Sequence, residues 1–130
     1  MKTEVQYLIY VCILTALMWL PYVLERLVVQ GLEDAVGYPE QDARPSSAWA
    51  RRLKKAHYNA VENLVIFAPL VLTAQVLGAS SETIGTAAVW YFWARIVHAV
   101  SYLLAIPWVR TLAFAAGWIA TLVIAWKLLP

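Results

Sequence analysis

The chain has 130 residues, of which 62% are hydrophobic and only 14% carry a charge. Typical globular chains contain about 45 to 50% apolar and about 25% charged residues, so this composition excludes an ordinary soluble domain and indicates surface that faces lipid. The net charge of +2 and the lack of basic residues interleaved with aromatics exclude a nucleic-acid-binding protein. At this length we expect a single domain, residues 1–130.

The first apolar segment, residues 7–29, is long enough for the roughly 20 residues that a membrane helix needs. Lys2 ahead of it resembles the start of a signal peptide, but the apolar core is longer than a signal sequence has and no clear cleavage site follows. We therefore expect a retained first span. Residues 30–47 are rich in glycine, proline and acids, which disfavours both a helix and a span, and we expect a loop there.

Three further helices follow. Ser46 or Ser47 is suited to cap the start of a second helix, residues 48–77. Ser81 is suited to cap a third, residues 82–106, which ends before Pro107, and a fourth covers residues 108–129. The sequence thus predicts an all-α integral membrane protein with a bundle of four transmembrane helices.

The basic residues are distributed unequally between the two sides of such a bundle. The side with the loops after the first and third spans carries most of them, whereas the side with both termini carries only Lys2 and Lys127. The positive-inside rule therefore places those loops in the cytoplasm and the termini on the opposite side. The residues on the basic side are Arg26, Arg44, Arg51, Arg52, Lys54, Lys55 and Arg110.

Two helices carry polar stripes at spacings of three and four residues, which place each stripe on one helical face. The stripes are Arg52, Lys55, Asn59 and Glu62 in the second helix, and Tyr91, Arg95, His98 and Tyr102 in the third. A charged group that faces lipid costs about 2.5 to 3.5 kcal/mol, so such residues face a bundle interior or an aqueous cavity.

The stripes have two interpretations, of which the number of cationic residues favours the second. In the first, Glu62 and Arg95 form a buried ion pair that fixes helix register. In the second, the excess of cationic donors over the single acid indicates a pocket for an anion that carries carboxylates, with Glu62 receiving its ammonium group.

Other chemistry has less support in the sequence. His57 and Glu62 are five residues apart, which does not place them on one helical face, so we expect no metal site and assign both His57 and His98 to helix packing or to a supporting role. The single cysteine, Cys12, excludes an internal disulfide and has no neighbour that would activate it. Arg110 is either an interfacial residue or a guanidinium that stabilises a ligand's thiolate.

The polar residues resemble a known family pattern. Lys55-Ala-His-x-Asn59-x-x-Glu62, then Arg95-x-x-His98-x-x-x-Tyr102, then Pro107-x-x-Arg110-Thr111 is similar to the MAPEG family, the membrane-associated proteins of eicosanoid and glutathione metabolism. The similarity covers nearly the whole chain, and bacterial members look closest.

The resemblance implies a homotrimer with glutathione bound between subunits at the cytoplasmic side. Arg110 matches the arginine assigned to the thiolate in related synthases, and Lys55 stands where the family usually has arginine. The glutathione-binding positions that it implies are Arg26, Arg52, Lys55, His57, Asn59, Glu62, Arg95, His98 and Tyr102.

We therefore expect an enzyme of a bacterial inner membrane that uses glutathione as co-substrate and conjugates its thiolate to a lipophilic electrophile arriving from the bilayer lipids. Peroxidase activity is a related expectation. The alternative is a non-catalytic binding or interaction protein of the same fold, in which the two stripes hold subunits together.

Overall fold

A computed structural model describes residues 1–38 and 45–130, and its regular secondary structure there is entirely helical. The helices are α1 (Thr3–Leu17), α2 (Trp19–Gln30), α3 (Leu32–Val36), α4 (Ala48–Val76), α5 (Glu82–Leu103) and α6 (Pro107–Leu128). Arg44, which we counted on the basic side, lies outside the described residues.

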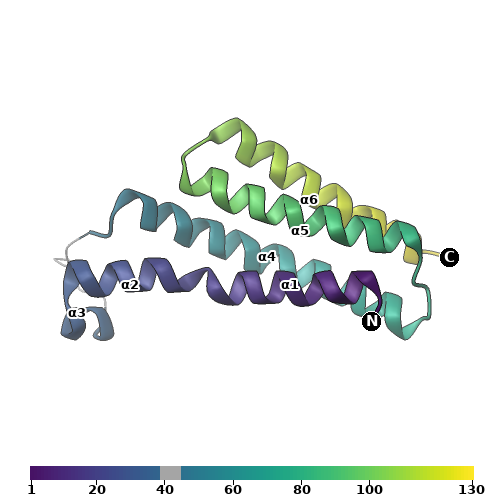
Figure 1. Cartoon of the computed structure of the whole chain (residues 1–130), viewed down its shortest axis with the longest axis horizontal. Helices are drawn as coiled ribbons and strands as arrows, with labels where there is room; N and C mark the ends of the chain where they lie inside the picture. Colours follow the sequence, from purple (N-terminus) through teal and green to yellow (C-terminus); the bar gives the residue numbers. More distant parts are fainter. Residues whose placement is uncertain (39–44) are drawn as a thin grey trace.

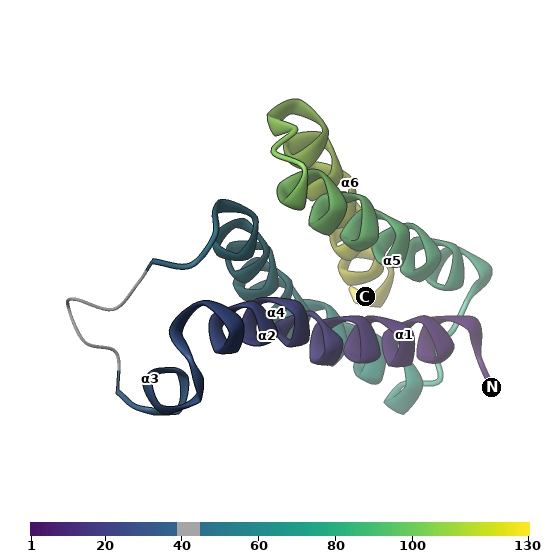
Figure 2. The same ribbon diagram turned by 60° about the vertical axis from the view of Figure 1, so that its left-hand side comes forward.

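The long helices form a bundle in which α1 and α2 run in line beside α4, and α5 and α6 form a hairpin (Figure 1). Both termini and the α4–α5 turn lie at one end of the bundle, while the α5–α6 connection and the start of α4 lie toward the other (Figure 1). Figure 2 shows the α5–α6 hairpin leaning away from α2 toward that second end. Cations near the start of α4 and the start of α6 are thereby brought to the same end.

The first apolar segment is divided into two helices in line with each other. Met18 separates them, and its N–H is shared between the carbonyl groups of Leu14 and Thr15. Proline at position 21 explains the break, because it has no N–H for the carbonyl of Leu17 and its ring crowds that carbonyl. Thr3–Gln30 remains long and apolar enough to cross a membrane.

The segment that leads into α4, and the start of α4 itself, differ from our predictions in two details. The short helix α3 occupies part of the segment in which we predicted a loop, and that prediction was wrong for residues 32–36. Gly31, with a φ of 85°, provides the turn that separates α2 from α3. Ser47 precedes α4 as predicted, but its side chain does not cap α4. It hydrogen-bonds Glu25 of α2 instead.

Ser81 does cap α5, since its hydroxyl accepts a hydrogen bond from the N–H of Ile84 at 3.3 Å. Within the described residues, three segments are long and apolar enough to span a membrane, namely Thr3–Gln30, Ala48–Val76 and Pro107–Leu128. The third helix of our four, α5, is not among them.

Helix α5 packs against α1, α4 and α6, so it has more buried positions than any other helix of the described chain. Small residues allow the closest approach, with Ala88 and Ala94 of α5 and Ala113, Gly117 and Ala120 of α6 all buried. In lipid, helices associate through such close packing because there is no hydrophobic force between them. Phe67 and Tyr91 stack at the centre, with ring centroids 3.8 Å apart.

Candidate functional site

A cavity of about 280 Å³ lies where α4 passes the α5–α6 connection. We call it the cationic pocket. Its lining residues are Arg52, Lys55, Ser101, Tyr102, Ala105, Ile106, Pro107 and Arg110. Three of these are cations and, within the described part of the chain, none is an acid. The two polar stripes and the Pro-x-x-Arg motif thus meet at one place.

The backbone between α5 and α6 forms one wall of the cationic pocket. Helix α5 ends in a turn in which the N–H of Ile106 donates to the carbonyl of Ser101 at 2.8 Å, with Ala105 in the left-handed region at a φ of 60°. Glycine usually occupies that position in this helix-ending turn, and an alanine there costs about 1 kcal/mol. Pro107 then begins α6, where its fixed φ suits the first helical position. This short connection brings Arg110 back toward the last turn of α5.

Arg110 and Arg52 are each held by one contact to α5. The guanidinium carbon of Arg110 lies 4.9 Å from the ring centroid of Tyr102, a cation–π contact. The Nε of Arg52 donates to the carbonyl of Leu103 at 3.0 Å. Within the described residues, the Nη groups of both arginines are without an acceptor in the protein, so both keep donors for a ligand.

Beneath the pocket lies a second group of polar residues, Asn59, Arg95 and His98, which we call the polar layer. The Nη1 of Arg95 donates to Oδ1 of Asn59 at 3.1 Å, and its Nη2 lies 3.5 Å from the carbonyl of Ala113. Arg95 and His98 are only 2% and 4% exposed. The Nε of Arg95 is buried with no partner among the described residues. Arg95 is therefore a buried cation held by neutral oxygens.

The ion pair between Glu62 and Arg95, the first of the two interpretations of the stripes, does not form within the described residues. Glu62 is exposed on α4. The partner of Arg95 is instead Asn59, which lies one turn before Glu62 on α4. Glu62 precedes Asn63, whose amide donates back to the carbonyl of Asn59 at 2.8 Å. Asn59 thus lies on the face of α4 toward α5, while Glu62 points outward.

Two other positions implied by the resemblance lie away from the cationic pocket. Arg26 is on α2, where its Nε donates to Oε1 of Gln30 at 2.9 Å. The Nδ1 of His57 lies 2.8 Å from the hydroxyl of Tyr22, so this histidine joins α4 to α2. That contact is of the helix-packing kind, one of the two roles that we expected for His57 from the sequence. His98 packs edge-on against Tyr102, with centroids 5.5 Å apart, which links the polar layer to the pocket wall.

The structure adds a contact that the sequence patterns did not reveal. Oε1 of Glu25 accepts hydrogen bonds from the N–H of Ser47, at 2.7 Å, and from its hydroxyl. Glu25 thus joins α2 to the residue that precedes α4, two turns before Lys55. The sequence does show an acid near the end of the first span, but it does not show that Ser47, 22 residues later, is the partner of that acid.

Comparison with known proteins identifies the family of the chain. A model of the MAPEG family matches residues 8–130. The chain belongs to this family. Neither a search of curated proteins nor a search of solved structures finds a match for it. The MAPEG match includes every residue of the cationic pocket and the polar layer. Together with the three apolar helices, it makes the chain an integral membrane protein related to glutathione and eicosanoid metabolism.

Proposed function

We propose that the protein is a glutathione-dependent membrane transferase that joins the glutathione thiolate to a lipophilic electrophile. The observation that carries this proposal is the convergence of Arg52, Lys55 and Arg110 on one pocket lined by no acid within the described residues. Glutathione carries two carboxylates and a thiol that can ionise, and charge-assisted bonds from cations to such groups are among the strongest hydrogen bonds in proteins. Its anionic groups suit this pocket.

Arg110 is our candidate for the thiolate partner. A thiol has an ordinary pKa of about 8.5, and a nearby cation lowers it so that the nucleophile forms at neutral pH. The thiol proton leaves to water, and the sulfur electron pair forms the new carbon–sulfur bond. The leaving group departs with its bonding pair, or an epoxide opens and its oxygen takes a proton from water. Arg52, Lys55 and Tyr102 would hold the rest of the tripeptide, with the polar layer as support.

Helix α5 is our candidate for a fourth span. Its exposed positions beyond Thr86 are apolar, and they follow the three- and four-residue spacing of one helical face: Trp90, Trp93, Val97 and Val100. Its polar stripe faces inward, with Tyr91, Arg95 and His98 buried. Such a helix suits a membrane although it is not among the three segments that qualify as spans by length and hydropathy. We further propose that the cationic end of the bundle faces the cytoplasm.

Glu62 supports an oligomer, which we propose to be a homotrimer. It is exposed at the middle of α4, on a face that also exposes Val61, Val65 and Ile66. An acid facing lipid at that depth costs about 2.5 to 3.5 kcal/mol, so a neighbouring subunit is the favourable cover. Glutathione bound at the same interface would present its ammonium group to Glu62.

The test is an ultraviolet difference spectrum as glutathione is added to purified protein, measured beside the conjugation rate with a generic electrophile. We expect a thiolate band in the native protein. Arg110→Ala should abolish the thiolate band and lower the conjugation rate by about 10²- to 10³-fold, the effect of removing an electrostatic stabiliser. Glutathione should still bind to this variant. Lys127→Ala, a cation at the other end of α6, is the control and should match the native protein.

Equal loss of binding and rate in Arg110→Ala would remove the catalytic role from this residue. Absence of a thiolate band in the native protein would favour the alternative, a non-catalytic MAPEG member. The burial of Arg95 against Asn59 favours that alternative, because it gives these two residues of the stripes a structural use.

A further inference from the structure

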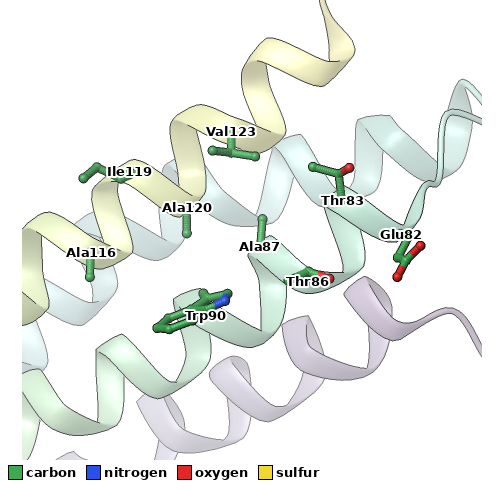
Figure 3. A pocket seen from close by; sticks show the side chains of 9 residues that line it. All are labelled: Glu82, Thr83, Thr86, Ala87, Trp90, Ala116, Ile119, Ala120 and Val123. Carbon is green, nitrogen blue, oxygen red and sulfur yellow. The ribbon is translucent and has the colours of Figure 1, made fainter.

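Helix α3 exposes apolar side chains although it lies outside the membrane spans. Leu32 is 70% exposed and Val36 is 76% exposed, and the helix has no buried residue. Exposed apolar residues of the long helices are different. Ile119, at the groove between α5 and α6 in Figure 3, belongs to Pro107–Leu128, which is long and apolar enough to cross a membrane. The apolar surface of α3 therefore needs a separate explanation.

The five residues of α3 are divided between an apolar face and an acidic face. A helix turns by about 100° per residue, so Ala35, Leu32 and Val36 fall within an arc of about 100°. Glu33 and Asp34 lie on the opposite side of the helix. This division is typical of a helix that lies at a boundary between water and lipid.

Helix α3 is too short to be stable by itself, since isolated helices of fewer than about 12 to 15 residues are marginal in water. Among the described helices, α2 is the only one that contacts it. Figures 1 and 2 both show α3 turned aside at the end of α2, on the side away from α4. The apolar face of α3 thus requires a second surface beyond α2.

The length of the first span places α3 at the membrane surface. Thr3–Gln30 has 28 residues, or about 42 Å at 1.5 Å per residue. The hydrocarbon core of a bilayer is about 30 Å thick, and about 40 to 45 Å with its head groups. Gln30 therefore ends at the head-group level, and Gly31 alone separates it from α3. Leu24 and Val28, one turn apart, continue the exposed apolar surface of the span to this level.

We propose that α3 is an interfacial helix that lies on the bilayer surface. Leu32 and Val36 insert between the lipid head groups, while Glu33 and Asp34 face water. The helix carries two acids and no cation, so apolar contact holds it and anionic head groups are not required. A surface of zwitterionic phospholipid is sufficient.

A neighbouring subunit is the less favourable cover for this face. The apolar arc offers three side chains, whereas stable protein interfaces involve about 20 to 30 residues a side, and their cores are depleted in acids. Glu62, our candidate subunit contact, lies on α4, and α3 lies on the side of α2 away from α4 (Figures 1 and 2). Lipid is already present at the end of the span and needs no further partner.

The experiment measures the depth of spin labels on the full chain in phosphatidylcholine nanodiscs. Cys12→Ala removes the single cysteine, and Leu32→Cys, Val36→Cys or Glu33→Cys then provides one labelling site. Collisions of the label with oxygen, which concentrates in lipid, are compared with collisions with a water-soluble nickel chelate. We expect the labels at positions 32 and 36 to favour oxygen and the label at position 33 to favour the chelate.

A polar substitution tests whether the apolar face holds α3 at the surface. Leu32→Ser should accelerate hydrogen exchange at residues 33–36 by about tenfold, because loss of two methylene contacts already has that effect. The label of Val36→Cys should lose its preference for oxygen in this background. Glu33→Ser introduces the same side chain on the opposite face, and the label of Val36→Cys should keep its preference there.

The proposal fails if the labels at positions 32 and 33 meet the chelate equally, since α3 would then lie in water. It also fails if Leu32→Ser leaves the label of Val36→Cys unchanged. Spin–spin broadening of the label at position 32 without a preference for oxygen would assign this face to a second copy of the chain. None of these readouts involves glutathione, so they are independent of the proposed transferase activity.

Discussion

The Nη1 of Arg95 on α5 donates a hydrogen bond to Oδ1 of Asn59 on α4 at 3.1 Å. The two residues are 36 positions apart in the sequence, and their bond joins the two polar stripes. The guanidinium is buried and has no acid near it within the described residues, so the amide oxygen is its closest hydrogen-bond acceptor, beside the rings of Tyr91 and Phe114. Asn59→Leu should therefore cost about 3 kcal/mol of stability, because it strands a buried charge. Thermal unfolding in detergent measures this loss.

The double variant Asn59→Leu with Arg95→Leu is the control for that prediction. Removing both partners should restore a large part of the lost stability, with a coupling of about 1 to 3 kcal/mol. Simple addition of the two single effects would show that the bond contributes nothing.

Gly117 of α6 faces the same guanidinium. A methyl group at this position would lie 2.8 Å from Nη2 of Arg95, closer than such atoms approach. Gly117→Ala gains about 1 kcal/mol of helix propensity, but it displaces Arg95 from Asn59 at a cost of about 1.5 to 3 kcal/mol. We expect net destabilisation by about 1 kcal/mol. In an Arg95→Ala background the sign should reverse, and a lowered melting temperature there would contradict this account.

Lys55 lines the cationic pocket at a position where the family usually has arginine. An arginine can hold a carboxylate with two parallel bonds, which an ammonium cannot. Lys55→Arg should therefore tighten glutathione binding, by about three- to tenfold, measured by calorimetry. Lys54→Arg is the matched control, because Lys54 lies over the ring of Tyr58 and outside the pocket. An equal effect of both changes would point to a general effect of arginine in this region rather than to a contact in the pocket.

Glu25 accepts two hydrogen bonds from Ser47 and so holds the start of α4 against α2. Glu25→Ala should release the first turn of α4, since loss of a capping interaction costs about 0.5 to 2 kcal/mol. Hydrogen exchange at residues 47–51 should then accelerate by about tenfold. Glu33→Ala, in α3, should leave that exchange unchanged. Unaltered exchange in Glu25→Ala would mean that packing alone holds this turn.

The sequence by itself determined the class of protein and the positions of α4, α5 and α6. Composition required lipid contact, and the spacing of apolar residues and caps placed the long helices to within a few residues, including the Ser81 cap. These features are local, so they can be read without knowledge of neighbours. The motif from Lys55 to Arg110 was also sufficient to suggest the family that the comparison confirms.

Only the tertiary structure decided which polar residues meet. Periodicity places Asn59 and Glu62 on one stripe of α4, but the rotation of α4 about its axis selects Asn59 as the partner of Arg95 and leaves Glu62 exposed. Likewise, the turn at Ala105 brings Arg110 to Arg52 and Lys55, whereas Arg26 pairs with Gln30 on α2. Helix rotation and crossing depend on contacts between small residues of different helices, and no single helix encodes them.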